Sequence, residues 1–160
     1  MKSIKLYSVM IILVSLFGCA SPGPMQTTTG VMRTPAFRPL ALDTTNDGSK
    51  EILFKEYTTM YDDKQLRRWG VFFITDRGAY MASWDTQTYI YNLNYQLKKE
   101  EILEILDETV VRKYWHDSNL LVIKDVRGNK IGFALIDKIA ARSLLQKFVM
   151  QNKTMHQKES

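Results

Sequence analysis

A succession of strand-like segments joined by short turns constrains the fold of this chain more than any other feature of its sequence. Stretches rich in β-branched and aromatic residues alternate with turn-forming clusters. The predicted strands are residues 51–61, 69–75, 79–84, 89–96, 110–115, 120–126 and 131–136. Such short turns join antiparallel strands, whereas parallel strands need long crossover connections. The chain therefore predicts one antiparallel sheet of six to seven strands.

Two segments of this region have helical features. Residues 98–108 have the composition of a helix but lie between strands, so we predict a short helical turn that leads into a strand. After the last strand, Asp137 is a candidate N-cap for a helix that runs to about residue 151. Its apolar residues recur at the spacing i, i+3, i+4 and i+7, which places on one stripe Ala141, Leu144, Leu145 and Phe148. Because an isolated helix of this length is marginally stable, we expect the stripe to pack on the sheet.

The N-terminal end of the chain has the pattern of a secretory signal peptide. Lys2 and Lys5 give it a positive start, and residues 6–17 are mostly apolar. This apolar stretch is too short to span a bilayer as a helix, which needs roughly 20 residues. We therefore predict a leader, residues 1–18, that is removed from the mature chain.

The end of this leader, Leu16-Phe17-Gly18-Cys19, resembles the lipobox of bacterial lipoproteins, in which a small residue precedes a cysteine. The resemblance implies cleavage after Gly18, and a diacylglycerol and an N-acyl lipid on Cys19. Two or more acyl chains anchor a protein stably, whereas one chain binds reversibly. Because Ala20, and not an aspartate, follows the cysteine, the resemblance also implies the outer membrane, facing the periplasm.

A tether is expected between the lipid and the sheet. Residues 19–49 contain all four prolines and several polar clusters, and such a composition buries too little apolar surface to order itself. We predict a flexible linker that holds a domain of residues 50–152 off the membrane, with a polar tail at 153–160. Docking on the domain or on a partner is the alternative for its scattered apolar residues, Val31, Met32, Phe37 and Leu40.

Charge and cysteine content argue against two classes of site. Without Lys2 and Lys5 of the leader, 20 basic residues face 17 acidic ones, a net charge of +3. This charge is too mild for a nucleic-acid partner, and no basic run occurs. An exported chain with one cysteine has no internal disulfide and no cysteine-based zinc site. Burial of apolar surface must therefore stabilise the domain.

Parts of the domain resemble the GRAM and bacterial PH-like families. Residues 70–78 resemble their second strand and the turn after it, residues 120–136 their late hairpin, and residues 140–148 their closing helix. The resemblance implies an α+β, mostly β fold: a strongly bent antiparallel sheet or PH-like barrel of six to seven strands, closed by one C-terminal amphipathic helix. A roll with a single helix on one sheet face is the alternative. The first hairpin loop, residues 62–68, mixes acidic with basic residues, so we do not expect it to recognise phosphoinositides.

The sequence does not present a catalytic or metal-binding constellation. His156 lies in the polar tail and His116 in a predicted turn, and no Gly-x-Ser-x-Gly motif occurs. The acidic residues of segment 100–108 would share a face, and would bind a cation weakly, only in a helix; a charged solvent face is the simpler interpretation. We predict no enzyme activity, no metal and no cofactor other than the lipid on Cys19.

Aromatic side chains are the remaining candidates for a binding surface. Alternation places Tyr89, Tyr91 and Tyr95 on one face of a strand. These residues are packing residues if that face is the core, and an exposed platform for a protein or glycan if it points outward. The whole candidate surface consists of Trp84, Tyr89, Tyr91, Tyr95, Tyr114 and Trp115.

The sequence therefore predicts a membrane-anchored envelope lipoprotein with a non-enzymatic protein-binding or scaffolding module. Its expected partner is another protein of the cell envelope. The alternative is a carrier or enzyme that acts on a small ligand or on an envelope glycan or lipid. That alternative requires a pocket with convergent polar groups near His116 or the acidic cluster. A third interpretation is a structural lipoprotein that anchors or spaces the envelope.

Overall fold

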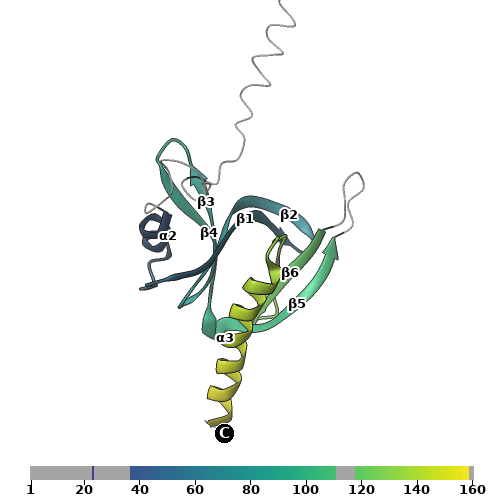
Figure 1. The fold of residues 1–160 in the computed structure, drawn as a ribbon. Helices are drawn as coiled ribbons and strands as arrows, with labels where there is room; N and C mark the ends of the chain where they lie inside the picture. Colours follow the sequence, from purple (N-terminus) through teal and green to yellow (C-terminus); the bar gives the residue numbers. More distant parts are fainter. Residues whose placement is uncertain (1–22, 24–36, 111–117, 159–160) are drawn as a thin grey trace, which may run out of the picture.

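The computed structural model describes Gly23 and residues 37–110 and 118–158 (Figure 1). Its strands are β1 (Ile52–Asp62), β2 (Gln65–Thr75), β3 (Gly78–Asp85), β4 (Ile90–Lys98), β5 (Ile102–Val110), β6 (Ser118–Asp125) and β7 (Lys130–Phe133). They form one antiparallel sheet of seven strands in the order β4-β3-β2-β1-β7-β6-β5. The predicted mostly β, α+β fold is confirmed at this level.

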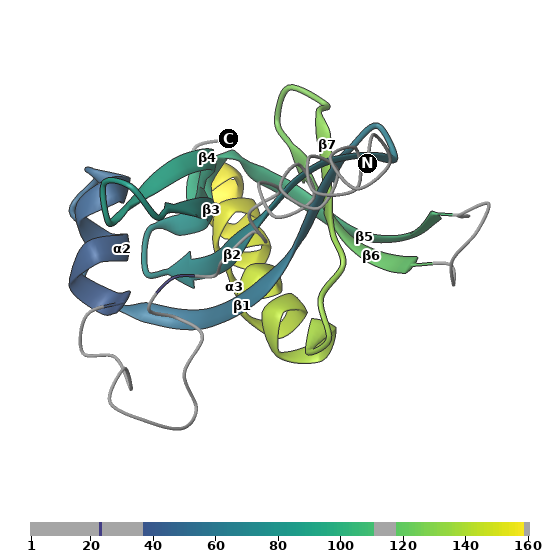
Figure 2. The same ribbon diagram turned by 90° about the horizontal axis from the view of Figure 1, so that it is seen from above.

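Helices pack on both faces of the sheet. They are α2 (Phe37–Thr45) and α3 (Lys138–Lys158), and a short 3-10 turn, η2 (Lys99–Glu101), connects β4 to β5. Figure 2 shows α3 on one face of the sheet and α2 beside the β1–β4 half. The side chains of β2 alternate between the two layers: Phe72 and Ile74 pack with α3, while Val71 and Phe73 pack with α2. A strand buried on both faces is a continuous apolar run, as this one is.

Helix α2 lies in the segment that we predicted to be a flexible tether, so that prediction is wrong for residues 37–49. Phe37 is 1% exposed, and its ring packs edge-to-face on the rings of Phe73 at 6.1 Å and Tyr91 at 5.3 Å. Ala41, one turn later, is fully buried against the same strands. The apolar surface of the sheet orders a segment that has too little apolar surface of its own.

The docking alternative is thus confirmed for Phe37 and for Leu40, which packs against the same cluster. The folded unit extends at least to Phe37 instead of beginning at residue 50. Val31 and Met32 lie outside the described residues.

Helix α3 confirms the predicted cap and stripe. The Ala140 N–H donates to the Asp137 carboxylate at 3.1 Å, as expected of an N-cap. Two further N–H groups at the helix start, those of Ile136 and Asp137, donate to the Glu56 carboxylate on β1 at 2.6 and 3.1 Å. The stripe residues Ala141, Leu145 and Phe148 are buried, and Leu144 packs beside them.

The helix is longer than predicted, since it continues to Lys158 through most of the supposed polar tail. Asn152 shows why this extension is stable. It is buried, and its amide donates to the carbonyl oxygens of Lys99 at 2.7 Å and Ile102 at 3.2 Å. These bonds tie the last turns of α3 to η2 and to the first residue of β5.

The sheet is neither closed nor strongly curled, so the predicted strong bend and barrel closure are wrong. β4 and β5 remain the two edge strands, and η2 connects them in sequence. Side chains satisfy part of these edges in place of strand pairing: Arg142 of α3 donates to the Leu106 carbonyl at 3.5 Å, and Asn94 donates to the Asn92 carbonyl at 2.9 Å. Proteins protect sheet edges by covering them with a helix, as α3 does at β5, or by making the edge strand irregular, as β4 is here.

The segment 98–108 forms the predicted helical turn, η2, followed by a strand, β5. This strand begins at Ile102 instead of residue 110. Residues 111–117, which hold most of the strand that we predicted there, lie outside the described residues. Because β5 is extended, its acidic side chains do not form the helical face considered above.

The β1–β2 hairpin turn contains two residues with positive φ, Asp63 at 46° and Lys64 at 62°. A two-residue turn of this kind favours glycine at its second position. We expect Lys64→Gly to raise the unfolding free energy by about 0.5 kcal/mol, because relief of the left-handed backbone exceeds the added entropy of the unfolded chain. The substitution also removes the exposed ion pair of Lys64 with Glu108, at 3.9 Å, which contributes little to the unfolding free energy.

Urea unfolding measures this effect. Gln65→Gly is the matched control, because Gln65 begins β2 and a glycine inside a strand destabilises it by about 0.5–1 kcal/mol. Equal destabilisation by both substitutions would contradict the account of strain in the turn.

Candidate functional site

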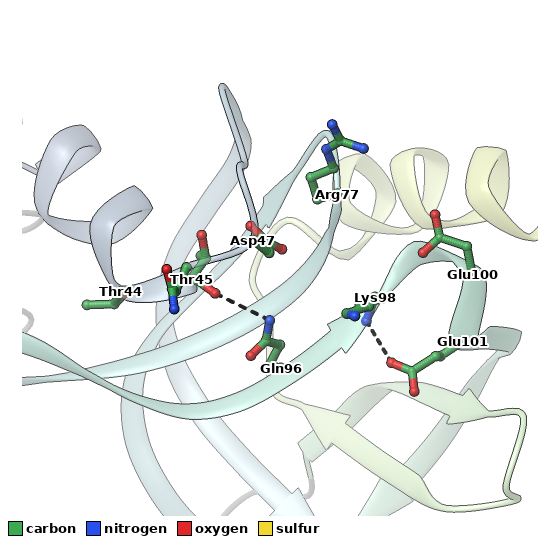
Figure 3. Close-up of a pocket in the computed structure, with 9 residues that line it drawn as sticks. Thr44, Thr45, Asp47, Arg77, Gln96, Lys98, Glu100 and Glu101 are labelled. Atoms are coloured by element: carbon green, nitrogen blue, oxygen red, sulfur yellow. Dashed lines mark hydrogen bonds between the residues drawn. The ribbon is translucent and has the colours of Figure 1, made fainter.

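A polar cavity of about 790 Å³ opens where the end of α2, the β2–β3 turn and the end of β4 meet (Figure 3). We call it the polar basin. Its lining residues are Thr44, Thr45, Asn46, Asp47, Arg77, Gln96, Lys98, Glu100 and Glu101. Figure 3 shows Gln96 between Thr45 and Lys98, with Arg77 and Glu100 farther out around the opening. The basin thus gathers side chains from three parts of the chain that are distant in sequence.

A hydrogen-bond network below the basin holds the chain after α2 against the β2–β3 hairpin. The Asp47 carboxylate accepts bonds from the Ser49 N–H at 3.0 Å and hydroxyl at 2.6 Å, and a third from the Tyr80 hydroxyl. The Ser49 hydroxyl also lies 2.9 Å from the Thr75 hydroxyl, which accepts the Arg77 N–H at 2.9 Å. Because Thr75 and Tyr80 are fully buried, this network fixes one wall of the basin before any ligand binds.

Two pKa shifts follow from this network. The pKa of Tyr80 is raised to about 12, mainly because its hydroxyl is buried and also because it donates to Asp47. Burial alone would raise the pKa of Asp47, but the hydrogen bonds from Ser49 and Tyr80 outweigh it and lower that pKa. Both shifts favour a neutral tyrosine that donates to an ionised carboxylate.

The shifts predict how stability depends on pH. Above pH 10, Tyr80 ionises in the unfolded chain but stays neutral in the folded chain until about pH 12. The free energy of unfolding should therefore fall between pH 10 and 12. At the acid end, the free energy of unfolding should fall as the pH drops from the ordinary pKa of an aspartate through the lowered pKa of Asp47 in the folded chain.

Chemical denaturation at pH 7, 10, 11 and 12 tests this expectation. Tyr80→Phe should flatten the alkaline decline relative to the unsubstituted protein. Tyr95, whose pKa is also raised by burial, contributes equally to both proteins. An alkaline slope that is identical in the two proteins would show that the Tyr80 hydroxyl is not responsible.

Charges of both signs surround the basin. The Lys98 N–H donates to the Glu101 carboxylate at 3.2 Å, and Glu101 also pairs with Arg127 at 3.7 Å. The Gln96 amide donates to the Thr45 carbonyl at 3.4 Å, which joins β4 to the end of α2. The basin is therefore hydrophilic and nearly balanced in charge.

The predicted aromatic face is divided by a β-bulge. Ala82 pairs with Leu93, but the adjacent Met81 pairs with Tyr95, so one residue of β4 has no partner on β3. An extra residue in a strand reverses the faces on which the following side chains lie. Tyr91 is consequently buried on the α2 side, while Tyr95 packs on the α3 side, with its ring 5.4 Å from that of Phe133.

Two of the predicted aromatic residues meet at the β3–β4 hairpin. The rings of Trp84 and Tyr89 lie 6.3 Å apart, and Tyr89 is 71% exposed. Ile90, which sequence analysis did not select, follows at 47% exposure. We call Trp84, Tyr89 and Ile90 the aromatic tip. Tyr114 and Trp115 lie outside the described residues.

Asp85 holds the turn between Trp84 and Tyr89 of the aromatic tip. Its carboxylate accepts the N–H groups of Gln87 at 2.8 Å and Thr88 at 3.3 Å, and these bonds lower the pKa of Asp85. Its carbonyl accepts the Tyr89 N–H at 2.9 Å. Tyr89 has a φ of 55°, an uncommon conformation for a bulky residue. The turn therefore presents the tyrosine outward in a defined and strained backbone.

The acidic residues of β5 pair individually with basic residues of neighbouring elements. Glu104 lies 3.6 Å from Lys124, and Asp107 lies 2.6 Å from Arg142. Within residues 37–110 and 118–158, no group of three or more metal-ligating side chains is assembled. His116 lies outside the described residues. These contacts support a charged, solvent-facing surface.

The polar basin was missed because half of its lining was assigned to the tether. Thr44 to Asp47 are turn-forming residues, and no local pattern indicates that they would face Gln96 and Arg77. The predicted association of a pocket with the acidic cluster applies only to its first residues, Glu100 and Glu101.

No protein-family model and no curated protein matches this chain. Within the part of the chain that the structure describes, none of the helices has the length and apolar character to cross a membrane.

Proposed function

We propose that this chain is a lipid-anchored envelope protein whose sheet domain binds another envelope protein without catalysing a reaction. The lipobox-like segment Leu16-Phe17-Gly18-Cys19 supports the anchor. The aromatic tip supports the binding surface. Outer-membrane attachment facing the periplasm, implied by Ala20, is part of the same proposal.

The exposed Tyr89 is the single observation that carries the binding function. Exposed aromatic residues are frequent energetic centres of protein interfaces. Backbone strain of the kind at Tyr89 is found most often where a residue has a function to perform. Because Asp85 already holds the turn, binding through Tyr89 and Ile90 would require little additional ordering.

The proposal includes the resemblance to PH-like folds, but only in the order of the strands and the helix. The order of a four-strand meander, three further strands and a C-terminal helix supports it. Barrel closure is not part of it. PH-like folds position binding loops on a rigid sheet, and the β3–β4 hairpin would be such a loop here.

Crosslinking in intact cells tests the binding surface. A photoreactive residue in place of Thr88, within the turn, should trap one envelope protein that can then be identified and purified. Tyr89→Ser in the mature chain should weaken binding to that partner tenfold or more. Leu66→Ser is the matched control, because Leu66 is a half-exposed apolar residue on β2, and it should leave binding unchanged. Equal binding by the Tyr89→Ser protein would refute the assignment.

The anchor is tested separately by labelling cells with a fatty acid analogue. The unsubstituted protein should carry the label and Cys19→Ala should carry none. Ser21→Ala, just beyond the cleavage site, should be labelled normally. Labelling of the Cys19→Ala protein would refute the anchor without affecting the binding surface.

The polar basin favours a second candidate function, the carrying of a small polar ligand. Its volume lies in the range of small-molecule sites. It also includes Glu100 and Glu101, which belong to the acidic cluster near which this alternative requires a pocket.

A further inference from the structure

We infer that the polar basin binds a neutral, polyhydroxylated ligand, namely a short oligosaccharide, between Gln96 of β4 and Arg77 of the β2–β3 turn. The inference deepens the second candidate function and is independent of the aromatic tip.

The lining of the basin selects against apolar ligands. The residues that line this cavity of about 790 Å³ carry hydroxyl, amide, carboxylate, guanidinium and ammonium groups. An apolar ligand would take these groups out of water without replacing their hydrogen bonds, which costs free energy for each group. A ligand that offers many hydroxyl groups would instead replace the hydrogen bonds that these groups make to water.

The charge balance selects against simple ions. Among the lining side chains, Asp47, Glu100 and Glu101 are acidic while Arg77 and Lys98 are basic, a formal net charge of only −1. The Asp47 carboxylate also lines the cavity, but it already accepts bonds from Ser49 and Tyr80. An anion therefore meets no surplus of positive charge, and the one excess negative charge resides on Asp47, whose oxygens are already occupied by neutral donors. A neutral ligand depends on neither charge.

The side chains of the basin suit pairs of neighbouring hydroxyl groups. The Asn46 and Gln96 amides each combine donors with an acceptor, the Arg77 guanidinium offers several donors, and a carboxylate offers two acceptor oxygens. Adjacent hydroxyls on a sugar ring can each donate and accept, so they match planar groups of this kind. Figure 3 shows Gln96 and Arg77 on different sides of the opening.

The basin is also held in place before binding. The Gln96 amide is oriented by its bond to the Thr45 carbonyl, and the wall below Asp47 is fixed by the buried Ser49–Thr75–Tyr80 network. A preformed site loses less conformational freedom when it binds a ligand. This matters for a saccharide, whose individual hydrogen bonds are weak in water.

Calorimetric titration of the mature, full-length chain tests the inference. The probes are two neutral trisaccharides, N-acetylglucosamine trimer and maltotriose, together with triglycine as a zwitterion and inorganic phosphate as an anion. We expect saturable binding of at least one trisaccharide, and weaker or no binding of the two charged probes. Gln96→Ala, at an exposed position, should lower the trisaccharide affinity tenfold or more.

Matched variants locate the binding and check the fold. Asn92→Ala lies on the same strand outside the basin and should bind as the unsubstituted protein does. Arg77→Gln, on the opposite side of the opening, should weaken binding as Gln96→Ala does. Tyr89→Ser should leave saccharide binding unchanged, so failure of the protein-binding proposal and failure of this one are distinguishable.

Three results would overturn the inference. One is the absence of binding by either trisaccharide. Another is trisaccharide binding that survives both Gln96→Ala and Arg77→Gln, since the ligand would then occupy another site. The third is tighter binding of triglycine or phosphate than of the trisaccharides, which would assign the basin to a charged ligand.

Discussion

Replacing Phe37 with alanine is expected to lower the free energy of unfolding by about 3–5 kcal/mol. The side chain is almost completely buried, and it fills the space between α2 and the sheet. Its edge-to-face contacts with Phe73 and Tyr91 add to the transfer free energy of the ring. Helix α2 has only nine residues, so once this contact is lost it has little intrinsic stability with which to remain docked.

Urea unfolding followed by far-ultraviolet circular dichroism measures this loss. Asp43→Ala is the matched control on the same helix, because Asp43 is exposed, and its effect should stay within about 0.5 kcal/mol. If residues 37–49 were a flexible tether, both substitutions would have equally small effects. That outcome would contradict the docking of α2.

Replacing Leu145 with alanine is expected to cost about 2–5 kcal/mol of unfolding free energy. Leu145 is fully buried at the centre of the α3 stripe, against the apolar face that contains Phe72 and Phe133. Removing it leaves a cavity between the helix and the sheet. Since α3 also covers the carbonyls of edge strand β5 through Arg142 and Asn152, weaker packing of the helix exposes that edge as well.

Met150→Ala is the matched control for this second substitution. It removes a side chain of similar size from the same helix, but at 66% exposure, and should change stability by less than about 0.5 kcal/mol. The two proteins are compared by urea unfolding at constant m-value. A cost for Leu145→Ala no greater than that for Met150→Ala would mean that the helix does not stabilise the sheet.

Local signals predicted the elements that local interactions stabilise. The cap at Asp137 and the stripe from Ala141 to Phe148 were correct because both depend on residues within a few positions of one another. The hairpins of β1 to β4 were predicted for the same reason, but the first loop is shorter than the predicted residues 62–68, because β2 begins at Gln65 instead of residue 69. The continuation of α3 beyond residue 151 was not predicted, because Asn152 is held by carbonyls of η2 and β5, some fifty residues away.

Local sequence patterns predicted less of the candidate site than of the fold. The period of two placed Tyr91 and Tyr95 on one face, but a single unpaired residue in β4 separates them. Periodicity cannot reveal a bulge, because the bulge arises from how β3 pairs with β4. The polar basin joins Thr45, Arg77 and Gln96, whose proximity depends on the docking of α2 and on the strand order.

The sequence by itself determined the strands of the β1–β4 meander and the C-terminal helix, because periodicity, caps and turns act within a few residues. Only the tertiary structure decided that Phe37 and its helix join the core, that the sheet stays open and that Tyr89 stands outside while Tyr91 lies inside. The physical reason is that burial depends on surfaces that distant segments create for each other. A polar, proline-containing stretch is ordered when a neighbouring sheet supplies the apolar surface that it lacks.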